Sequence, residues 1–92
     1  MTEDDRIRGT VIEKLLCHAF LSKHEIESQF NIGFDLYFRP ELARLLEFEQ
    51  DGLIAGVGSS DLRVTSLGRI YIRTIAQVFD AFQAAAVASR AV

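Results

Sequence analysis

Cysteine is nearly absent from this 92-residue sequence, which contains one, Cys17. A single cysteine cannot form an internal disulfide bond, and it cannot hold an iron–sulfur cluster alone. No CxxC or HExxH motif accompanies it. The adjacent His18 would point about 100° away from Cys17 on a helix, and His24 lies on a separate predicted helix. These three residues therefore predict no metal site.

Long hydrophobic runs are also missing. No apolar stretch approaches the ~20 residues that are needed to cross a bilayer. The opening residues, MTEDDRIRG, are charged and lack the apolar segment of a signal peptide. Together with the lone cysteine, these features predict a soluble, cytoplasmic protein that does not associate with membranes.

Positive charge is not in excess. The chain has 10 Lys and Arg against 13 Asp and Glu, which gives a net charge of −3. This balance is unfavourable for non-specific binding of nucleic acid. The sequence also lacks a GxSxG nucleophile motif and a glycine-rich phosphate-binding loop. We expect no catalytic residue, no metal site and no cofactor site within this chain.

Apolar residues make up 49% of the sequence and include seven phenylalanines, enough for one hydrophobic core. The chain is therefore expected to form a single domain over residues 1–92. The spacing of its apolar residues and its turn residues predict a series of elements. These are helices over 4–20, 23–30, 35–38 and 40–50, strands over 53–57 and 62–64, a long helix over 66–82, and a frayed helical tail over 83–92.

Several residues mark the ends of these elements. Ser22 and Glu25 have the spacing of a capping box, which predicts the start of the second helix. Gly52 follows the third long helix at the position where glycine usually ends a helix. Thr65 is predicted to cap the last helix.

The predicted order is helix, helix, helix, hairpin, helix. This order predicts a mostly α-helical fold with a small β-hairpin, winged-helix-like, in which the hairpin is the wing. A winged helix often binds DNA, but the helix that would enter the groove is acidic here. Residues 39–51 contain two arginines against four carboxylates, which disfavours contact with phosphates. We interpret those carboxylates as a solvated helix face: Glu41, Glu47, Glu49 and Asp51.

The stretch over residues 62–80 organises the rest of the chain. Projected as a helix, its second part gathers a wide apolar arc on one side and a narrow basic stripe on the other. Arg69 and Arg73 form the stripe, and Arg63 lies close by in sequence. They are either a solvated face or cations that pair with carboxylates of a ligand or partner. The predicted apolar arc is Leu67, Tyr71, Ile72, Ile75, Val78, Phe79 and Phe82.

Three stretches carry a family likeness: VIEKLLC near the start, FEQDGLI after the third helix, and LRVTSLGRIYIRTIAQVFDAF. The most specific part is the pattern V-T-x-x-G-R-x-x-x-R-x-I-x-x-x-F-D, which begins at Val64. With these motifs, residues 6–82 resemble the C-terminal domain of oxygen-independent coproporphyrinogen III oxidase. That enzyme is the radical S-adenosylmethionine (SAM) oxidase of haem biosynthesis.

The resemblance implies a large barrel domain followed by a small helical domain like this one. It further implies a four-iron four-sulfur cluster on a CxxxCxxC motif and bound S-adenosylmethionine, both on the barrel, and neither is expected in this chain. The implied reaction is the oxidative decarboxylation of two propionates of coproporphyrinogen III to give protoporphyrinogen IX. This chain alone is expected to be inactive.

The resemblance also implies a use for the basic stripe. Arg63, Arg69 and Arg73 are the candidates for binding the substrate's propionates or docking on the barrel domain. An apolar docking surface is expected around Tyr37, Phe38 or Ile70.

Two other hypotheses stay open. The chain could be a stand-alone winged-helix module or regulator that binds a tetrapyrrole, with His18 and His24 as axial ligands. It could also be a regulator that binds DNA, which the charge balance disfavours.

Overall fold

A computed structural model describes residues 2–80, and the tail predicted over 83–92 lies outside that range. The described part is mostly helical with a small sheet, which confirms the predicted fold class. In chain order the elements are α1 (Glu3–His18), β1 (Phe20–Ser22), α2 (Lys23–Phe30), α3 (Phe34–Tyr37), α4 (Arg39–Gln50), β2 (Ile54–Ala55), β3 (Asp61–Val64), the 3-10 helix η1 (Gly68–Tyr71) and α5 (Ile72–Gln77).

The sheet has three antiparallel strands in the order β1-β3-β2. The β2–β3 pair is the predicted hairpin, although β2 is shorter than the strand expected over 53–57. Along β3, Leu62 and Val64 are buried while Arg63 points to solvent, as the period of two predicts. Strand β1 was not predicted, because its pairing of Leu21 with Leu62 joins segments that are distant in sequence. The winged-helix name stays a prediction.

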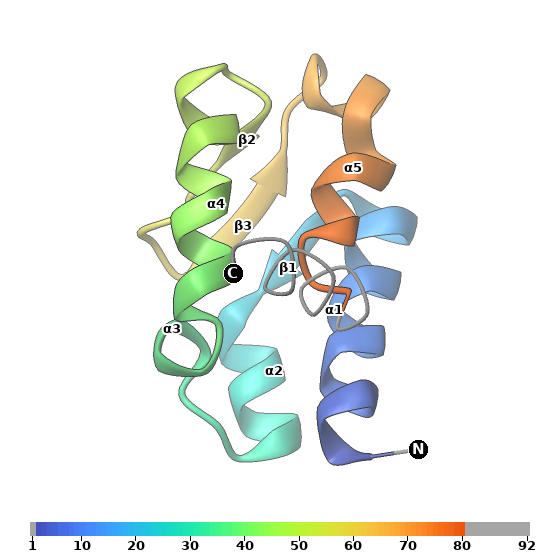
Figure 1. Ribbon diagram of the computed structural model, residues 1–92, viewed down its shortest axis with the longest axis vertical. Coiled ribbons are helices and arrows are strands. Elements are labelled where there is room, and N and C mark those ends of the chain that lie inside the picture. Colours follow the sequence, from blue (N-terminus) through green and yellow to red (C-terminus); the bar gives the residue numbers. More distant parts are fainter. Residues whose placement is uncertain (1, 81–92) are drawn as a thin grey trace, which may run out of the picture.

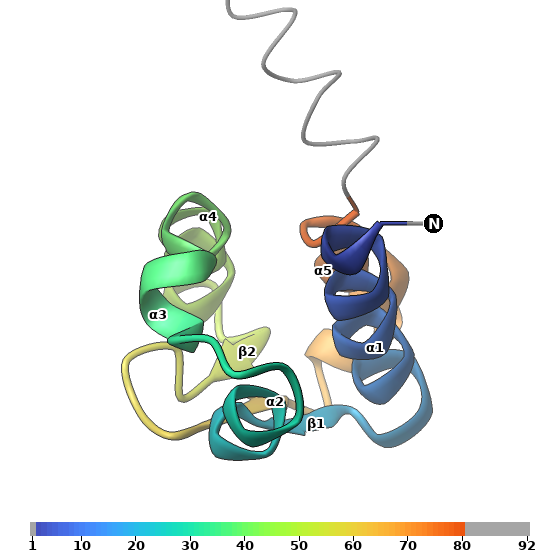
Figure 2. The same cartoon turned by 90° about the horizontal axis from the view of Figure 1, so that it is seen from below.

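The elements form two flanks joined by the sheet. Figures 1 and 2 show α1 and α5 side by side on one flank and α3 and α4 on the other, with α2 and β1 between them. The core fills the space between the flanks, and a cluster of aromatic rings formed by Phe34, Phe38 and Phe79 links α3 and the following residue to the end of α5. This arrangement brings residues from both halves of the sequence into one core.

Local capping signals are confirmed where they were clearest. The side chain of Ser22 accepts a hydrogen bond from the backbone N–H of Glu25 and caps α2. Gly52 follows α4 with φ of +77°, a conformation that side chains rarely adopt. Each of these features depends on a few adjacent residues, which is why the sequence was sufficient to predict them.

The prediction of one long helix over residues 66–82 is wrong. The chain instead forms a turn, then η1, and only then the six-residue helix α5. Thr65 does not cap α5, whose N-cap is Tyr71; its Oγ1 instead accepts a hydrogen bond from the N–H of Gly68 in the preceding turn. Gly68 also lies so close to the carbonyl of Leu53 that a Cβ atom would come within 1.8 Å of its oxygen. The α-helical repeat begins only at Ile72, after this close contact and the 3-10 helix.

The apolar arc predicted for that helix is therefore only partly buried. Ile75, Val78 and Phe79 belong to the core, but Leu67 and Tyr71 are exposed. Phe82 lies outside the described residues. In α4, the apolar side chain of Leu46 is 48% exposed.

Candidate functional site

Three short elements carry the three candidate arginines. Arg63 lies on β3, Arg69 on η1 and Arg73 at the start of α5. All three side chains are exposed, and none has an ion pair within residues 2–80. Their guanidinium groups are therefore available to an external carboxylate.

The fold brings two of the three together. Arg63 and Arg69 line one surface depression of about 310 Å³, where the end of α1, strand β1 and η1 meet. His18 and the hydroxyl groups of Thr65 and Ser66 also line it. The Arg63–Arg69 depression thus gathers cationic and hydrogen-bonding side chains from segments that are far apart in the sequence.

Arg73 lies in a different hollow, the α1–α5 groove, with a volume of about 440 Å³. Its apolar lining comes from Ile12 and Leu16 on α1 and from Ile72 on α5. Asp80 lines the same groove, so its charged groups are of both signs. The three arginines of the basic stripe are therefore divided between two hollows, the polar Arg63–Arg69 depression and the more apolar α1–α5 groove.

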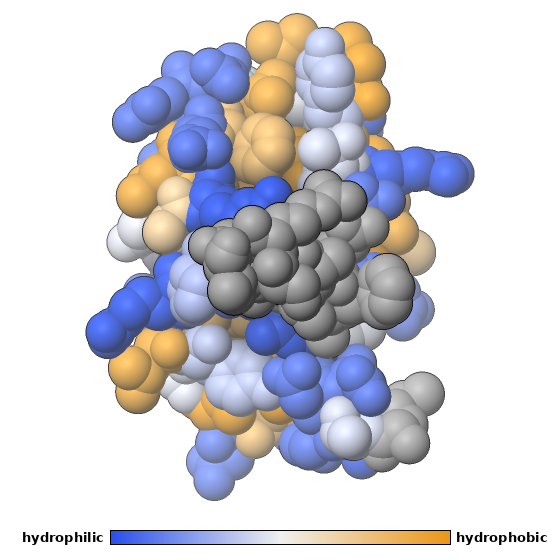
Figure 3. All heavy atoms as spheres, in the orientation of Figure 1, coloured by the Kyte–Doolittle hydropathy of each residue, from blue (hydrophilic) through white to orange (hydrophobic). Residues whose placement is uncertain are grey.

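Exposed apolar side chains lie beside both hollows. Figure 3 shows hydrophobic surface at the upper end of the molecule, over η1 and the start of α5. In this segment Leu67 is 55%, Ile70 75% and Tyr71 50% exposed. Of the residues expected to form a docking surface, Ile70 is exposed, whereas Phe38 is fully buried and Tyr37 is half-buried.

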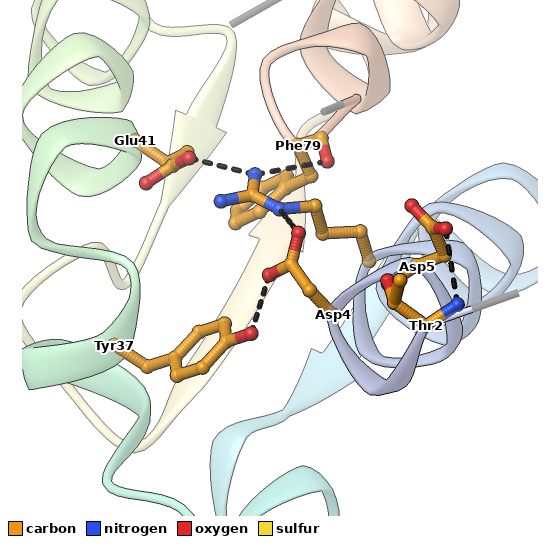
Figure 4. Close-up of polar contacts among 7 residues, drawn as sticks. Thr2, Asp4, Asp5, Tyr37, Glu41 and Phe79 are labelled. Carbon is orange, nitrogen blue, oxygen red and sulfur yellow. Dashed lines mark hydrogen bonds and ion pairs between the residues drawn. The ribbon is translucent and has the colours of Figure 1, made fainter. Parts of the chain in front are cut away.

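A polar network absent from the sequence-based prediction holds the two flanks together. Arg8 Nη1 lies 2.7 Å from Glu41 Oε2 on α4 and 3.3 Å from the carbonyl oxygen of Phe79. Arg8 Nε lies 2.9 Å from Asp4, which in turn accepts a hydrogen bond from the hydroxyl of Tyr37. Figure 4 shows these contacts converging from α1, α3, α4 and Phe79, which follows α5.

The network corrects the interpretation of Glu41 as part of a solvated face. The residue is 5% exposed, and its carboxylate faces the guanidinium of Arg8. The spacing of Asp4 and Arg8, four residues apart on one helix, was a sequence signal for part of this network. Nothing local to α4 indicates that Glu41 faces the core.

Burial and pairing shift the pKa values of two members of this network. Burial lowers the pKa of the Arg8 guanidinium, but hydrogen bonds and charge attraction from Glu41 and Asp4 outweigh it, so the pKa is raised overall. Burial of the Tyr37 hydroxyl and its hydrogen bond to Asp4 raise its pKa from 10.0 to about 12. Arg8 therefore stays charged and Tyr37 stays neutral at physiological pH.

A second buried cation anchors the loop between the hairpin strands. Lys23 is 5% exposed, and its Nζ lies 2.8 Å from Asp35 Oδ1 and 2.8 Å from the carbonyl oxygen of Val57. The N–H of Val57 donates to Glu49 Oε2 at 3.2 Å. Both contacts hold the hairpin loop against the helical part of the molecule.

Within residues 2–80, the side chains do not fit a metal centre or a pair of axial haem ligands. No group of three or more His, Cys, Asp and Glu side chains within residues 2–80 could hold a metal ion. His18 and His24, the suspected axial ligands, line different surface hollows. Among the described helices, none is long and apolar enough to cross a membrane.

Comparison with curated proteins finds relatives over most of the chain. The sequence is 48% identical to an oxygen-independent coproporphyrinogen III oxidase of Synechocystis sp., over 89% of this chain and 18% of that protein. It is 47% identical to the protein of the same name from Thermostichus vulcanus, over 88% of this chain and 25% of that protein. The chain therefore spans a quarter or less of the length of these relatives.

A solved structure supports the same relationship. Coproporphyrinogen III oxidase from Escherichia coli, described as a radical SAM enzyme, matches this fold with a TM-score of 0.85 and 38% sequence identity. The match covers 89% of this chain and 19% of the other. No family model matches the sequence.

Proposed function

Because this chain is related to the C-terminal portion of oxygen-independent coproporphyrinogen III oxidases, we propose that it is the non-catalytic domain of such an enzyme. In this proposal it associates with the radical SAM portion, on the same or a separate chain, and contributes to the conversion of coproporphyrinogen III to protoporphyrinogen IX. The observation that carries the proposal is the structural match to the Escherichia coli enzyme, at a TM-score of 0.85 and 38% identity.

The catalytic chemistry is assigned to the part of the enzyme that this chain does not span. A radical SAM reaction needs a cysteine-bound iron–sulfur cluster, and the single cysteine of this sequence cannot supply the ligands. The proposed roles of the domain are therefore limited to association with the catalytic portion and to contacts with the substrate.

The surface around η1 and α5 supports both roles. Exposed guanidinium groups bind carboxylates in a bidentate manner, and coproporphyrinogen III carries propionate side chains. The neighbouring side chains of Leu67, Ile70 and Tyr71 are half or more exposed, which supports an apolar contact with the rest of the enzyme. We therefore assign Arg63, Arg69 and Arg73 to substrate binding or docking.

Complementation in trans tests the proposal. The Thermostichus vulcanus oxidase would be truncated to remove the segment that matches this chain, and the purified remainder would be mixed anaerobically with this chain. We expect the two to co-elute in gel filtration and to restore formation of protoporphyrinogen IX above the level of the truncated enzyme.

A matched pair of variants makes the test specific. Arg69→Ala with Arg73→Ala should reduce the restored activity at least tenfold, whereas Arg44→Ala should not change it. Arg44 is a suitable control because it is exposed on α4 and has no ion pair within the described residues. Absence of both association and restored activity would contradict the proposed function.

A further inference from the structure

The Arg63–Arg69 depression has two guanidinium groups in its lining, which suit it to an anion. Among residues 2–80, its polar side chains are the two arginines, His18, Ser66 and Thr65, with no carboxylate, and the Thr65 hydroxyl already donates to the carbonyl of Gly52. Two guanidinium groups on separate elements, β3 and η1, can contact one oxyanion from two directions. Arg63 and Phe20 also line a neighbouring hollow that contains Asp61, whereas Arg69 does not.

The α1–α5 groove has a different lining. Arg73 shares that groove with Asp80, and the remaining lining includes the apolar residues Ile12, Leu16 and Ile72. The lining is therefore largely apolar, with charged side chains of both signs. The groove is thus better suited to a protein segment than to a small anion.

Apolar surface borders the Arg63–Arg69 depression. Phe20 lines it and is 43% exposed. Its volume of about 310 Å³ is at the small end of the range for small-molecule sites, roughly 300–1,000 Å³. These features favour a ligand that places one acidic arm among the arginines and rests an apolar body against the phenylalanine.

We propose that the Arg63–Arg69 depression binds one carboxylate arm of a ligand whose ring body is apolar, and that Arg73 takes no part in this binding. Only the identity of the ligand, a tetrapyrrole with propionate side chains, rests on the proposed function. It divides the three arginines of the basic stripe into a ligand-binding pair and a third residue for protein contact.

Fluorescence titration of the complete 92-residue chain with coproporphyrin III tests the proposal directly. Coproporphyrin III is the stable, oxidised form of the tetrapyrrole and keeps its carboxylates, whereas its tetramethyl ester keeps the apolar body without charge. We expect the ester to bind at least tenfold more weakly than the acid. An excess of inorganic phosphate should displace the acid only weakly, because phosphate lacks the apolar body.

Variants locate the site. Arg63→Gln and Arg69→Gln should each weaken binding of coproporphyrin III by roughly tenfold, the loss of one charge-assisted hydrogen-bonding group. Arg73→Gln and the control Arg44→Gln should stay within twofold of the wild-type affinity. Circular dichroism of each variant would show that the fold is retained.

Three outcomes would overturn the proposal: no binding of the acid, equal affinity for the acid and the ester, or an equal loss for Arg73→Gln and Arg63→Gln. The titration and the complementation assay can fail separately. If activity is restored but coproporphyrin III does not bind to the isolated chain, only the proposed carboxylate site is rejected. Binding without complementation would reject only the proposed function.

Discussion

Arg8 Nη1 and Glu41 Oε2 lie 2.7 Å apart, although 33 positions separate the two residues in the sequence. Only 15% of the Arg8 side chain and 7% of the Glu41 side chain are exposed. The guanidinium also lies 5.4 Å from the centre of the Phe38 ring. This pair therefore fixes α1 against α4 from inside the molecule, and the further bond to the carbonyl of Phe79 holds the segment that follows α5.

Removing the cation from this pair should strongly destabilise the fold. Arg8→Ala leaves the buried carboxylate of Glu41 without a counter-charge, and we expect a loss of roughly 3 kcal/mol in the free energy of unfolding. Urea denaturation followed by circular dichroism would measure it. Arg6→Ala is the matched control, because Arg6 and its partner Glu3 are 63% and 61% exposed. Its loss should be less than about 1 kcal/mol, and equal losses for the two variants would contradict the structural role of Arg8.

Replacing Lys23 by methionine should loosen the hairpin loop. The change keeps the apolar stem but removes the hydrogen bond from Nζ to the buried carbonyl of Val57. We expect a loss of about 1–3 kcal/mol, with faster hydrogen exchange confined first to residues 56–60. Lys14→Met is the control, since Lys14 pairs with the exposed carboxylate of Glu25. Unchanged exchange in the loop of Lys23→Met would show that the contact does not anchor it.

Gly68→Ala should destabilise the turn that precedes α5. The added methyl group would lie 1.8 Å from the carbonyl oxygen of Leu53, so the backbone must move. We expect a loss of at least about 2 kcal/mol. Gly58→Ala provides the comparison, because nothing lies within 4 Å of the position of its Cβ. Thermal unfolding of the two variants should separate them, and similar melting temperatures would show that the turn can shift freely.

The hydroxyl of Tyr37 should make stability depend on alkaline pH. Its pKa is raised from 10.0 to about 12 in the folded chain. Between these values the unfolded chain loses the phenolic proton and the folded chain keeps it, so the stabilising contribution is complete below pH 10 and is lost as the pH rises towards 12.

Tyrosinate absorbance in a Tyr71→Phe variant would test this prediction, since that variant contains a single tyrosine. We expect its titration midpoint near 12 in the folded protein and near 10 in denaturant. The same low midpoint in both states would contradict the pairing of Tyr37 with Asp4.

Ile70→Asp should impair association with the catalytic portion of the enzyme without unfolding the domain. Ile70 is 75% exposed, so its replacement removes little buried area from the folded chain. We expect at least a tenfold loss of affinity for the truncated oxidase in the complementation assay. Leu36→Asp is the control, because Leu36 is 71% exposed on α3. Equal effects of the two substitutions would argue against a docking surface on η1.

The sequence predicted those features that a few neighbouring residues determine. The cap at Ser22 and the glycine after α4 both depend on backbone groups within a few positions. The alternation of buried and exposed side chains along β3 likewise follows from the two-residue period of a strand. The family likeness was also readable, because it lies in a continuous pattern that begins at Val64.

Other features were decided only when distant segments met. The sequence by itself determined a small, mostly helical domain with three arginines near its end. The chain forms η1 and the short α5 in place of the expected long helix, with Gly68 packed closely against Leu53. Glu41 was predicted to lie on the surface, but it is buried against Arg8. The tertiary structure likewise placed Arg63 and Arg69 in one depression and Arg73 in another. A helical projection contains no information about these contacts, because they depend on how separate segments pack.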